Sequence, residues 1–418
     1  MKKNVRILLL LFLMSSCSYL RERTPEKFQN VDADQITRDS EYGNIKEGLN
    51  KKIIVTDIDK CQELFLPSII DTVYGIKLDN HPEALLGSIE KMKLTDDAIY
   101  LLDKYTTKSV KVFSRSGKYT NTIGQRGRGP GEYYEPTDFY VGDNEIIIYD
   151  QFTSKLNYYD MTGNFIKDKK IPFYALSFHR YNKNSYVFHT FDSDNYHLPK
   201  ILNYSLIWTD STFAIKHINA FREKDKYTNL ISENDMNFLN QKLYYHEPYN
   251  DTVFMVSPDG NLYDDFKFSF PKNKLPPELL LRKNFKQKIR DTSPNSTKNY
   301  VENYSFPIIT QDFLYTKITV NSRIFNVFYS LKTNNVIIDN QFNQSDSPIM
   351  FFPPFNNILN CEGNTLIGYT DASNLHERFE LVQKYDEMHL LSDELIEFFK
   401  DIKEIDNPII VFTKLKVF

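Results

Sequence analysis

Short runs of alternating apolar and polar residues, each bounded by turn residues, recur along most of the chain. The clearest runs lie in residues 98–123 and 145–171. In each segment a β-rich run ends in an aspartate, and a polar turn and a second alternating run follow. A turn centred on glycine then leads into a further strand. This order of strands and turns predicts two successive antiparallel sheets.

The two segments are copies of one unit. Their aspartates, Asp103 and Asp150, are 150 − 103 = 47 residues apart, and their turn glycines, Gly117 and Gly163, are 163 − 117 = 46 apart. An inner strand plus three more strands of five or six residues, joined by tight turns, fill about 40 to 50 residues. The repeat therefore has the size of one four-stranded propeller blade, which needs neighbouring blades to bury its faces.

Fainter copies of the unit follow. They lie at residues 185–208, 241–270 and 313–338, and a further copy begins at residue 364. Residues 53–55 and 72–78 offer strands from the other end of the chain, so the ring closes by mixing strands from both ends. We predict an all-β fold, a six-bladed β-propeller of four-stranded antiparallel blades over residues 51–418. Seven blades stay open as an alternative.

Two segments break the β-pattern and predict helical insertions, near residues 275–300 and 373–402. The first is basic and predicts a helix around residues 278–289; it is either a solvated excursion between blades or a patch that binds anions. In the second, apolar residues recur at steps of three and four, and Ser392 provides a fresh N-cap. We expect two helices there, whose apolar stripe packs against the ring.

The N-terminus has the features of an export signal. Lys2, Lys3 and Arg6 precede an apolar run at residues 7–14, which is too short to span a bilayer. Small residues then precede Cys17. We predict a lipoprotein signal peptide at residues 1–16, lipidation of Cys17 and a polar tether at residues 17–50; an ordinary signal peptide is the alternative. The expected location is the bacterial cell envelope, anchored by lipid to the outer membrane, with the periplasmic or surface face left open.

Composition narrows the function classes. A net charge of −4 over 418 residues gives no support for nucleic-acid binding, and the 28 tyrosines and 32 phenylalanines favour β-structure. Besides Cys17, the cysteines are Cys61 and Cys361. They either form a disulfide where the ends of a closed ring meet or remain two separate thiols.

The loop GQRGRGPGEYYEP, residues 124–136, concentrates glycines and arginines as phosphate-binding loops do. It lacks the Lys-Ser or Lys-Thr of a P-loop, and it joins two strands rather than a strand and a helix. We interpret it as the joint between two blades. Its basic and aromatic side chains are candidate ligand-binding residues: Arg126, Arg128, Tyr133 and Tyr134. A second aromatic group, Tyr244, Tyr245 and Tyr249, surrounds His246.

Several of these features together resemble a known family. The lipobox-like start, GRGPGEY, the blade pattern IIIYD…LNYYD-x-x-G-x-F, the NDTVF segment and the terminal DNPIIVF resemble the six-bladed β-propeller lipoproteins of Bacteroidetes. Those proteins are similar to the NHL and TolB-like propeller group. The resemblance covers residues 69–418 and implies the fold and an envelope location. It implies no activity and no catalytic residues.

Catalytic and metal-binding motifs are missing from the sequence: there is no G-x-S-x-G, no H-E-x-x-H and no calcium loop of the EF-hand type. We therefore predict a monomeric, non-catalytic binding or scaffold module for a protein, peptide or glycan, without a cofactor. The alternative is a calcium-dependent hydrolase or lyase at the axial mouth, with acids such as Asp103, Asp150 and Asp251 as Ca²⁺ ligands. Turn capping is the other role open to these aspartates.

Overall fold

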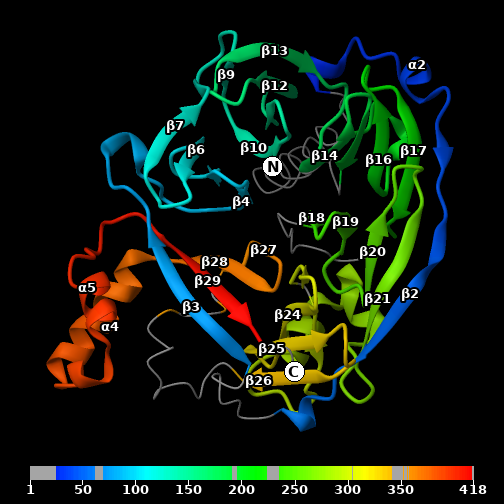
Figure 1. The fold of residues 1–418 in the computed structure, drawn as a ribbon. Helices are drawn as coiled ribbons and strands as arrows, with labels where there is room; N and C mark the ends of the chain where they lie inside the picture. The colour runs from blue at the N-terminus through cyan, green and yellow to red at the C-terminus, as the bar shows by residue number, and fades with distance from the viewer. Residues whose placement is uncertain are drawn as a thin grey trace, which may run out of the picture.

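Six sheets follow one another around a ring in the computed structural model of this chain (Figure 1). The structure describes residues 25–61, 69–190, 195–223, 235–303, 305–340, 352, 355 and 357–416. Each sheet is a blade whose first strand lies innermost. The predicted six-bladed β-propeller is confirmed. The predicted signal peptide and Cys17 lie outside the described residues.

The first two blades are the copies visible in the sequence, and each has four antiparallel strands. The strands of the first blade are β4 (Lys91–Leu94), β5 (Ala98–Asp103), β6 (Ser109–Ser114) and β7 (Tyr119–Ile123). Those of the second are β10 (Pro136–Val141), β11 (Ile146–Asp150), β12 (Lys155–Tyr159) and β13 (Phe165–Lys170).

The third and fourth blades each gain a fifth strand from the N-terminal segment, which pairs in parallel with their outer edge. The third contains β14 (Ser177–Asn182), β15 (Ser185–His189), β16 (Tyr204–Asp210), β17 (Ile215–Phe221) and β1 (Glu41–Tyr42). The fourth contains β18 (Met236–Leu239), β19 (Lys242–Tyr245), β20 (Thr252–Val256), β21 (Leu262–Ser269) and β2 (Ile45–Val55).

In the fifth blade two short strands share the inner position, and the sixth closes the ring. The fifth contains β22 (Val301–Glu302), β23 (Ile308–Ile309), β24 (Phe313–Val320), β25 (Arg323–Ser330) and β26 (Val336–Asn340). The sixth contains β27 (Asn360–Glu362), β28 (Thr365–Thr370), β29 (Ile409–Leu415) and β3 (Ile70–Lys77). Because β3 pairs antiparallel with β29, strands from the two chain ends join in one sheet, as predicted.

Residues 25–61, the N-terminal belt, differ from the predicted tether. The Lys27 ammonium donates to the carbonyl oxygens of Gln151 (3.0 Å) and Phe152 (2.9 Å) in the second blade. The belt then supplies β1 to the third blade and β2 to the fourth, and Lys52 donates to Asn334 (3.1 Å) in the fifth. Figure 1 shows this blue segment along the outside of the ring. The belt is ordered because the outer strand edges offer unpaired backbone groups for it to bind.

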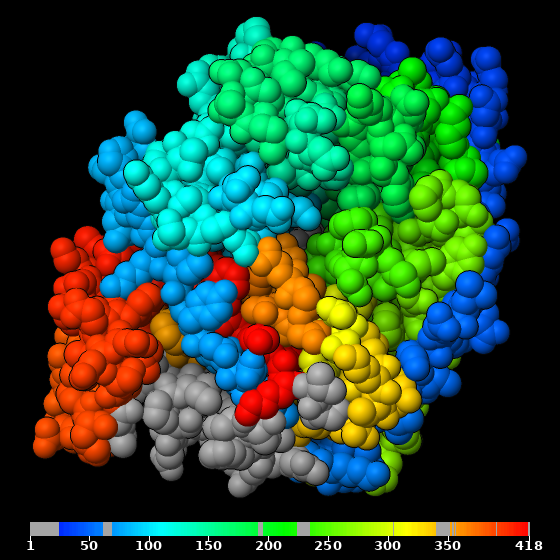
Figure 2. Space-filling view, in the orientation of Figure 1, coloured from blue at the N-terminus to red at the C-terminus, as the bar shows by residue number. Residues whose placement is uncertain are grey.

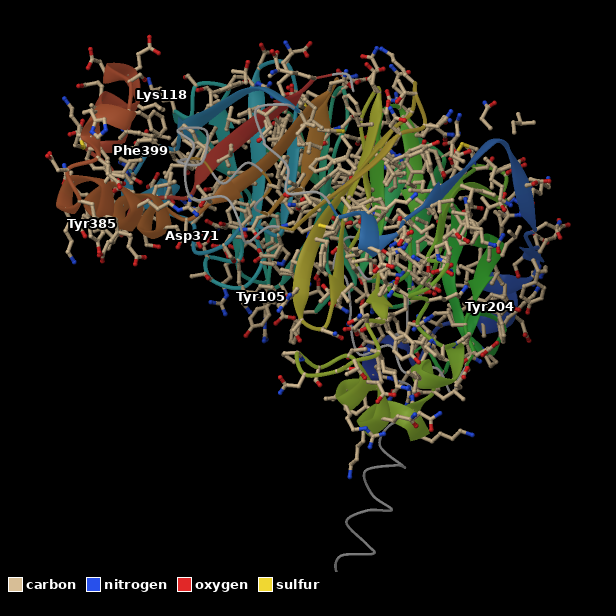
Figure 3. All side chains as sticks on the ribbon, turned by 90° about the horizontal axis from the view of Figure 1, so that it is seen from below. Tyr105, Lys118, Tyr204, Asp371, Tyr385 and Phe399 are labelled. Atoms are coloured by element: carbon tan, nitrogen blue, oxygen red, sulfur yellow. The ribbon has the colours of Figure 1, made fainter. Side chains whose placement is uncertain are left out.

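Helices α4 (Ala372–Lys384) and α5 (Asp393–Phe399) stand outside the ring against the sixth blade (Figures 1 and 2). Their apolar stripe packs on Ile409 and Val411 of β29, as predicted. Phe399 faces this contact, whereas Tyr385 is exposed (Figure 3). The Ser392 hydroxyl accepts from the amide of Leu395 (3.3 Å), which confirms the N-cap.

The first insertion is less helical than predicted. Instead of one helix over residues 278–289 it forms two 3₁₀ turns, Pro277–Leu280 and Arg282–Asn284, followed by α3 (Phe285–Asp291). Leu281 is extended between the two turns, with φ −77° and ψ 139°. The other helical pieces that the structure describes are short. In the belt these are α2 (Ala33–Thr37) and the 3₁₀ turns Glu26–Phe28 and Ile58–Lys60. In the loops they are the 3₁₀ turns Pro82–Ala84, Pro199–Ile201 and Met388–Leu390.

One face of the ring, which we call the loop face, carries the loops from blade to blade and those from the second to the third strand of a blade. It includes residues 104–108, 124–135, 151–154, 246–251 and 271–300. Figure 3 shows Tyr105 on this face and Lys118 on the opposite one. Insertions on this face leave the blade sheets intact, so it is where the chain can vary without loss of the fold.

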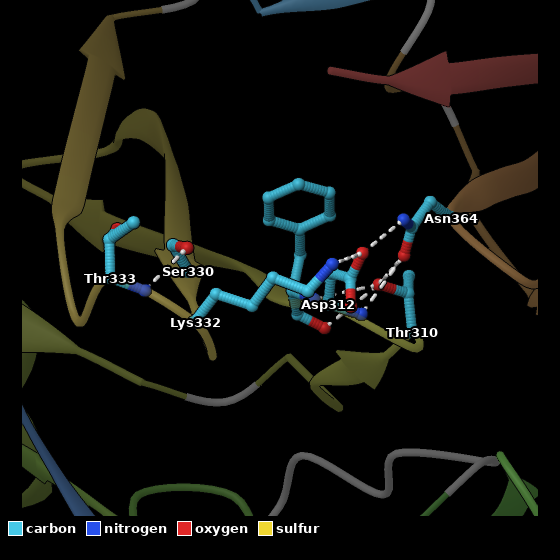
Figure 4. A network of polar contacts seen from close by, with 7 residues as sticks. Thr310, Asp312, Ser330, Lys332, Thr333 and Asn364 are labelled. Atoms are coloured by element: carbon cyan, nitrogen blue, oxygen red, sulfur yellow. Dashed lines mark hydrogen bonds and ion pairs between the residues drawn. The ribbon is translucent and has the colours of Figure 1, made fainter. Parts of the chain in front are cut away.

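On the opposite face a polar network joins the fifth and sixth blades (Figure 4). The Asp312 carboxylate accepts from the Lys332 ammonium (2.8 Å) and from the amide of Asn364 (2.7 Å). Burial raises the pKa of Asp312, but these two donors outweigh it, so the pKa lies below its ordinary value. The network fixes the register between two blades whose apolar wedge lies just inside it.

The two cysteines that the structure describes are not joined to each other. Cys61 and Cys361 pack against the same hydrophobic cluster, and no disulfide joins them. Within the described ranges, no helix is long and apolar enough to cross a membrane.

Candidate binding site on the loop face

Two buried aspartates hold the loop face together in the first two blades. The Asp150 carboxylate accepts from the backbone amides of Tyr134 (2.9 Å), Glu135 (3.2 Å), Phe152 (3.0 Å) and Thr153 (3.4 Å). The Thr153 hydroxyl also donates to it (2.7 Å). One carboxylate at the end of β11 therefore ties the loop that enters its blade to the loop that leaves β11.

Asp103 does the same one repeat earlier. It accepts from the amides of Gly87 (2.7 Å), Thr106 (2.8 Å) and Thr107 (3.1 Å) and from the hydroxyls of Thr107 (3.0 Å) and Ser88 (3.4 Å). Asp251, the third predicted acid, forms an ion pair with Lys274 (2.6 Å). The described residues hold no group of three or more His, Cys, Asp or Glu side chains placed for a metal ion. The contacts of Asp103 and Asp150 are therefore those of residues that cap turns.

The loop of residues 124–136 is the joint between the first two blades, as predicted. Gly124 and Gly131 have φ of +63° and +75°, which favour glycine. The Glu132 carboxylate accepts from the amide of Gly129 (2.7 Å) and from Gln125 (2.7 Å). These hydrogen bonds lower the pKa of Glu132, with that of Gly129 contributing most. An acidic side chain thus fills the centre of the loop.

The four candidate residues of this loop divide into two groups. Arg126 and Arg128 lie on the surface, with guanidinium carbons 5.3 and 5.5 Å from the centre of the Tyr134 ring, and Tyr134 contacts Phe152 (4.5 Å between centroids). Tyr133 points the other way and is fully buried between blades, where its hydroxyl donates to Ile123 O (2.9 Å). Tyr133 therefore belongs to the core and has no surface for a ligand.

A pocket of about 320 Å³ opens on the loop face between the third, fourth and fifth blades. The first insertion forms its roof, through Lys274, Leu275, Pro277 and Leu280. Its floor comes from the loop after β19 and from residues that flank the neighbouring strands: Phe221, Arg222, Glu247, Tyr249, Asn250, Asp251, Phe270, Val301 and Asn303. Its size lies at the lower end of the range for small-ligand sites.

Two charged residues of the pocket, Glu247 and Arg222, are paired with one another. Glu247 Oε1 accepts from the hydroxyls of Tyr245 (2.5 Å) and Ser205 (2.9 Å), and Arg222 Nε lies 3.5 Å from it. All three contacts are to Oε1. The other carboxylate oxygen of Glu247 makes no contact with the described residues, so it remains available to a donor in the pocket.

A second pair lies behind Tyr249. The Lys288 ammonium of α3 contacts Glu302 (2.8 Å) and donates to the Tyr249 hydroxyl (2.6 Å). Tyr249 has φ +65°, a conformation that few residues other than glycine adopt, and its amide donates to Asn303 O (2.6 Å). The insertion thus contacts Tyr249 of the pocket wall through Lys288, whose charge is neutralised by Glu302.

Two buried polar atoms beside the pocket have no hydrogen-bond partner in the described structure, Asn303 Oδ1 and His246 Nδ1. Asn303 lines the pocket. His246 Nε2 lies 2.8 Å from Asn250 O and must donate to it, so Nδ1 is the bare acceptor of a neutral ring. Burial lowers the pKa of His246 to about 4, which keeps the ring neutral at physiological pH.

The sequence indicated parts of this pocket but not the pocket itself. Of the aromatic group around His246, Tyr244 and Tyr245 are buried, and Tyr249 lines the pocket. The basic insertion was expected to be a solvated excursion or an anion patch. Arg282, Lys283, Lys286 and Arg290 are exposed, as in a solvated excursion. Lys274 and Lys288 are instead bound to acidic residues of the ring and hold the insertion over the pocket as a roof.

Comparisons with known proteins define the relatives of this fold. A family profile described as a domain of unknown function, DUF4934, matches residues 51–414. A solved structure from Bacteroides fragilis NCTC 9343, of a protein described as exported, is 19% identical with a TM-score of 0.71; the alignment covers 87% of this chain and 100% of that one. At that identity the likeness shows the fold alone. No curated protein sequence matches the chain.

Two further structures are less similar. A member of the DUF4221 family from Bacteroides vulgatus ATCC 8482 has a TM-score of 0.45 at 9% identity, over 83% of this chain and 97% of that one. A streptogramin B lyase has a TM-score of 0.38 at 10% identity, over 71% and 80%.

Proposed function

The chain belongs to the DUF4934 family, and we propose that it is a binding module of the bacterial envelope that holds a peptide segment of a partner protein in the pocket beneath the insertion. The observation that carries this proposal is the pocket itself. It combines apolar walls with polar atoms that have no hydrogen-bond partner among the described residues, on the ring face where loops can vary without loss of the blades.

The charges of the pocket favour a neutral ligand backbone. Arg222 and Lys274 of the lining, and Lys288 behind it, each contact a carboxylate of the ring, so a charged ligand that bound one of them would have to displace an existing ion pair. The atoms left over are acceptors, the second oxygen of Glu247 and Asn303 Oδ1. Peptide N–H groups supply donors to such acceptors, and peptide side chains fit the apolar walls.

A glycan fits this site less well. Sugar recognition commonly uses an exposed aromatic face as a stacking platform. Of the described aromatic residues of the pocket, Phe270 is buried in the core, the Tyr249 ring is covered by the Lys288 ammonium at 4.2 Å, and Phe221 alone is exposed. We therefore place a peptide ahead of a glycan.

The envelope location rests on the N-terminal sequence and on the exported protein of similar fold. In this proposal Cys17 carries the lipid and the belt begins a few residues later, so the anchor leaves the ring beside the second blade. Metabolic labelling with an alkyne fatty acid should mark the wild-type chain and not a Cys17→Ala variant. Equal labelling of both would exclude lipidation at this residue.

Binding is tested with the full chain, purified from membranes in detergent. A random peptide library displayed on phage is selected against it, and the affinity of enriched peptides is measured by calorimetry. The variant Leu280→Lys places a charge in the roof, and we expect it to weaken binding at least tenfold. The matched control, Leu381→Lys, changes an exposed leucine of α4 and should bind as the wild type does.

Circular dichroism shows whether both variants are folded. The peptide proposal fails if no peptide is enriched, or if Leu280→Lys and Leu381→Lys bind the enriched peptides equally. A glycan panel run in parallel would replace the peptide if it gave binding that Leu280→Lys abolishes.

A further inference from the structure

A second cavity, of about 220 Å³, lies beside the axis of the ring; we call it the axial cavity. It is enclosed by the innermost strands or their flanking residues in three consecutive blades, at β18, β23 and the residues before β27. Its lining residues are Asn237, Ser305, Phe306, Ile308, Tyr315, Thr316, Lys317, Asn357, Ile358 and Leu359. It shares none of them with the pocket on the loop face.

Lys317 is the one charged residue among the described residues of this lining. Within the described part of the chain its ammonium forms neither an ion pair nor a hydrogen bond. Its cross-strand neighbour is Asn326, and beyond Asn326 in the same row lies Asp339, whose carboxylate is 3.5 Å from the Asn326 amide. A neutral amide thus separates Lys317 from this carboxylate. Burial alone lowers the pKa of Lys317.

The charges around the axis do not neutralise Lys317 either. Lys91 contacts Asp138 at 2.5 Å, and Glu362 contacts Arg115 at 2.6 Å. Lys93 lies 5.9 Å from the ring of Phe238, next to Asn237 on β18, and burial together with Lys91 lowers its pKa. Asp138 and Glu362 are therefore each paired with a cation other than Lys317, and the lining favours an anion.

We propose that the axial cavity binds a small organic monocarboxylate, with its anionic group on Lys317 and its apolar part against Phe306, Ile308 and Ile358. A single ammonium matches one negative charge, whereas a dianion such as phosphate would leave a charge unpaired at a partly buried site. Ser305, Thr316 and Asn237 add neutral hydrogen-bonding groups. A cavity of about 150 Å³ holds benzene, so this one has room for an acid of roughly benzoate size.

The test uses the full chain with benzoate, hexanoate, benzamide, phosphate and sulfate as probes, each titrated by calorimetry. We expect benzoate or hexanoate to bind and benzamide, which has the same shape without the charge, not to bind. Lys317→Met should weaken carboxylate binding at least tenfold, and Lys317→Arg should retain it in part. Lys93→Met is the matched control, because it removes a nearby buried cation outside the lining, and it should bind within threefold of the wild type.

A second measurement needs no variant. Trace acetylation at pH 7.5, followed by peptide mass spectrometry, compares the reactivity of Lys317 with and without benzoate. Bound benzoate should protect Lys317 at least fivefold and leave the exposed Lys118 unchanged. The proposal is overturned if neither carboxylate binds or protects, if benzamide binds as well as benzoate, if Lys317→Met binds as the wild type does, or if phosphate alone shows the dependence on Lys317.

Discussion

The buried aspartates of the first two blades and the buried polar groups beside the pocket and the axial cavity differ in how many hydrogen bonds they make. In the first two, Asp103 and Asp150 each accept from five donors, and both carboxylates are fully buried. In the fourth and fifth, Asn303 Oδ1 and His246 Nδ1 have no hydrogen-bond partner among the described residues, and the Lys317 ammonium has no ion-pair partner there. The pocket and the axial cavity lie beside these groups, whereas a further hollow, lined in part by Glu135, Gln151 and Phe152, lies beside Asp150.

The difference shows where this ring keeps its structure and where it can take a ligand. A buried group with all its hydrogen bonds made stabilises the fold and has nothing left for a partner. A buried group without a partner costs stability, about 1 to 3 kcal/mol for a neutral one, and a ligand can recover that free energy. Asp103 and Asp150 thus hold the first two blades together, and the groups without partners mark the two sites that we propose in the fourth and fifth blades.

The largest expected effect comes from breaking the regular region. Asp150→Ala leaves the amides of Tyr134, Glu135 and Phe152 without their acceptor in a buried place, and it opens a cavity. We expect the free energy of unfolding to fall by about 3 to 5 kcal/mol. Chemical denaturation followed by fluorescence measures it.

The control is Asp160→Ala, in the turn between β12 and β13. Asp160 also accepts from turn amides, those of Thr162 (2.9 Å) and Asn164 (2.9 Å), but it is only half-buried. The Thr162 hydroxyl and the Asn164 side-chain amide contribute most to holding its pKa at about 2. Water replaces the lost contacts there, so the loss should be clearly smaller. Equal losses would mean that burial is not what makes Asp150 important.

The second expected effect is a loss of stability at low pH, caused by the buried His246 beside the pocket. The folded pKa of His246 is about 4, below its ordinary 6.5, so the unfolded chain takes up the proton first as the pH falls. Stability is therefore complete above about pH 6.5 and is lost at about 1.4 kcal/mol per pH unit between 6.5 and 4. At pH 5 the loss from this residue reaches about 2 kcal/mol.

His179 and His189, with folded pKa values of about 3, add to the same slope. Denaturation curves at pH 7.5, 6.5, 5.5 and 5.0 give the total dependence. His246→Gln should remove one proton from the slope between pH 6 and 5. An unchanged slope in that variant would show that Nδ1 of His246 finds a proton acceptor when it is charged.

The same contrast explains how much of the fold the sequence predicts. The blades are predictable because their strands alternate, and Asp103 and Asp150 recur at the period of the repeat. The belt is predicted only at residues 53–55, because β2 lies on an outer edge and is mostly exposed, so no apolar period marks the rest of it. Its two glycines, Gly43 and Gly48, lie against backbone of β21 and the turn before it, a fit that only the assembled ring defines.

The pocket and the axial cavity are harder still to predict. Their walls come from residues 221–303 and 237–359, which the closure of the ring brings together, and no local spacing records that. Within the loop of residues 124–136, the aromatic pair Tyr133 and Tyr134 is also ambiguous. Neighbouring residues in a short strand face opposite ways, and sequence alone does not say which one faces the core.

The third effect is moderate and concerns the roof of the pocket. Replacing residues 277–297 with a short Gly-Ser linker removes the burial of Leu279 and the contact of Lys288 with Glu302. We expect a loss of about 2 kcal/mol, because the ring sheets are untouched. The linker variant should melt cooperatively and lose peptide binding. If it fails to fold, the insertion belongs to the core rather than to the site.

The smallest effect lies inside the blade joint. Tyr134→Ala removes a half-exposed ring stacked beneath Arg126 and Arg128, and contacts of this kind contribute about 0.5 to 1 kcal/mol at exposed sites. Tyr133→Ala, one residue earlier, removes a fully buried ring and should cost about 3 to 5 kcal/mol. Paired denaturation curves measure both.

The two tyrosine variants show whether the surface side of the blade joint contributes to the stability of the ring. If Tyr134→Ala hardly changes the free energy of unfolding, the outer side of the joint is free to vary. Within this joint, Tyr133 then stabilises the fold while its neighbour Tyr134 does not. If Tyr134→Ala costs as much as Tyr133→Ala, then the arginines, Tyr134 and Phe152 brace the joint, and the surface of residues 124–136 serves the fold. A ligand role for Arg126 and Arg128 would then require them to leave contacts that the ring needs.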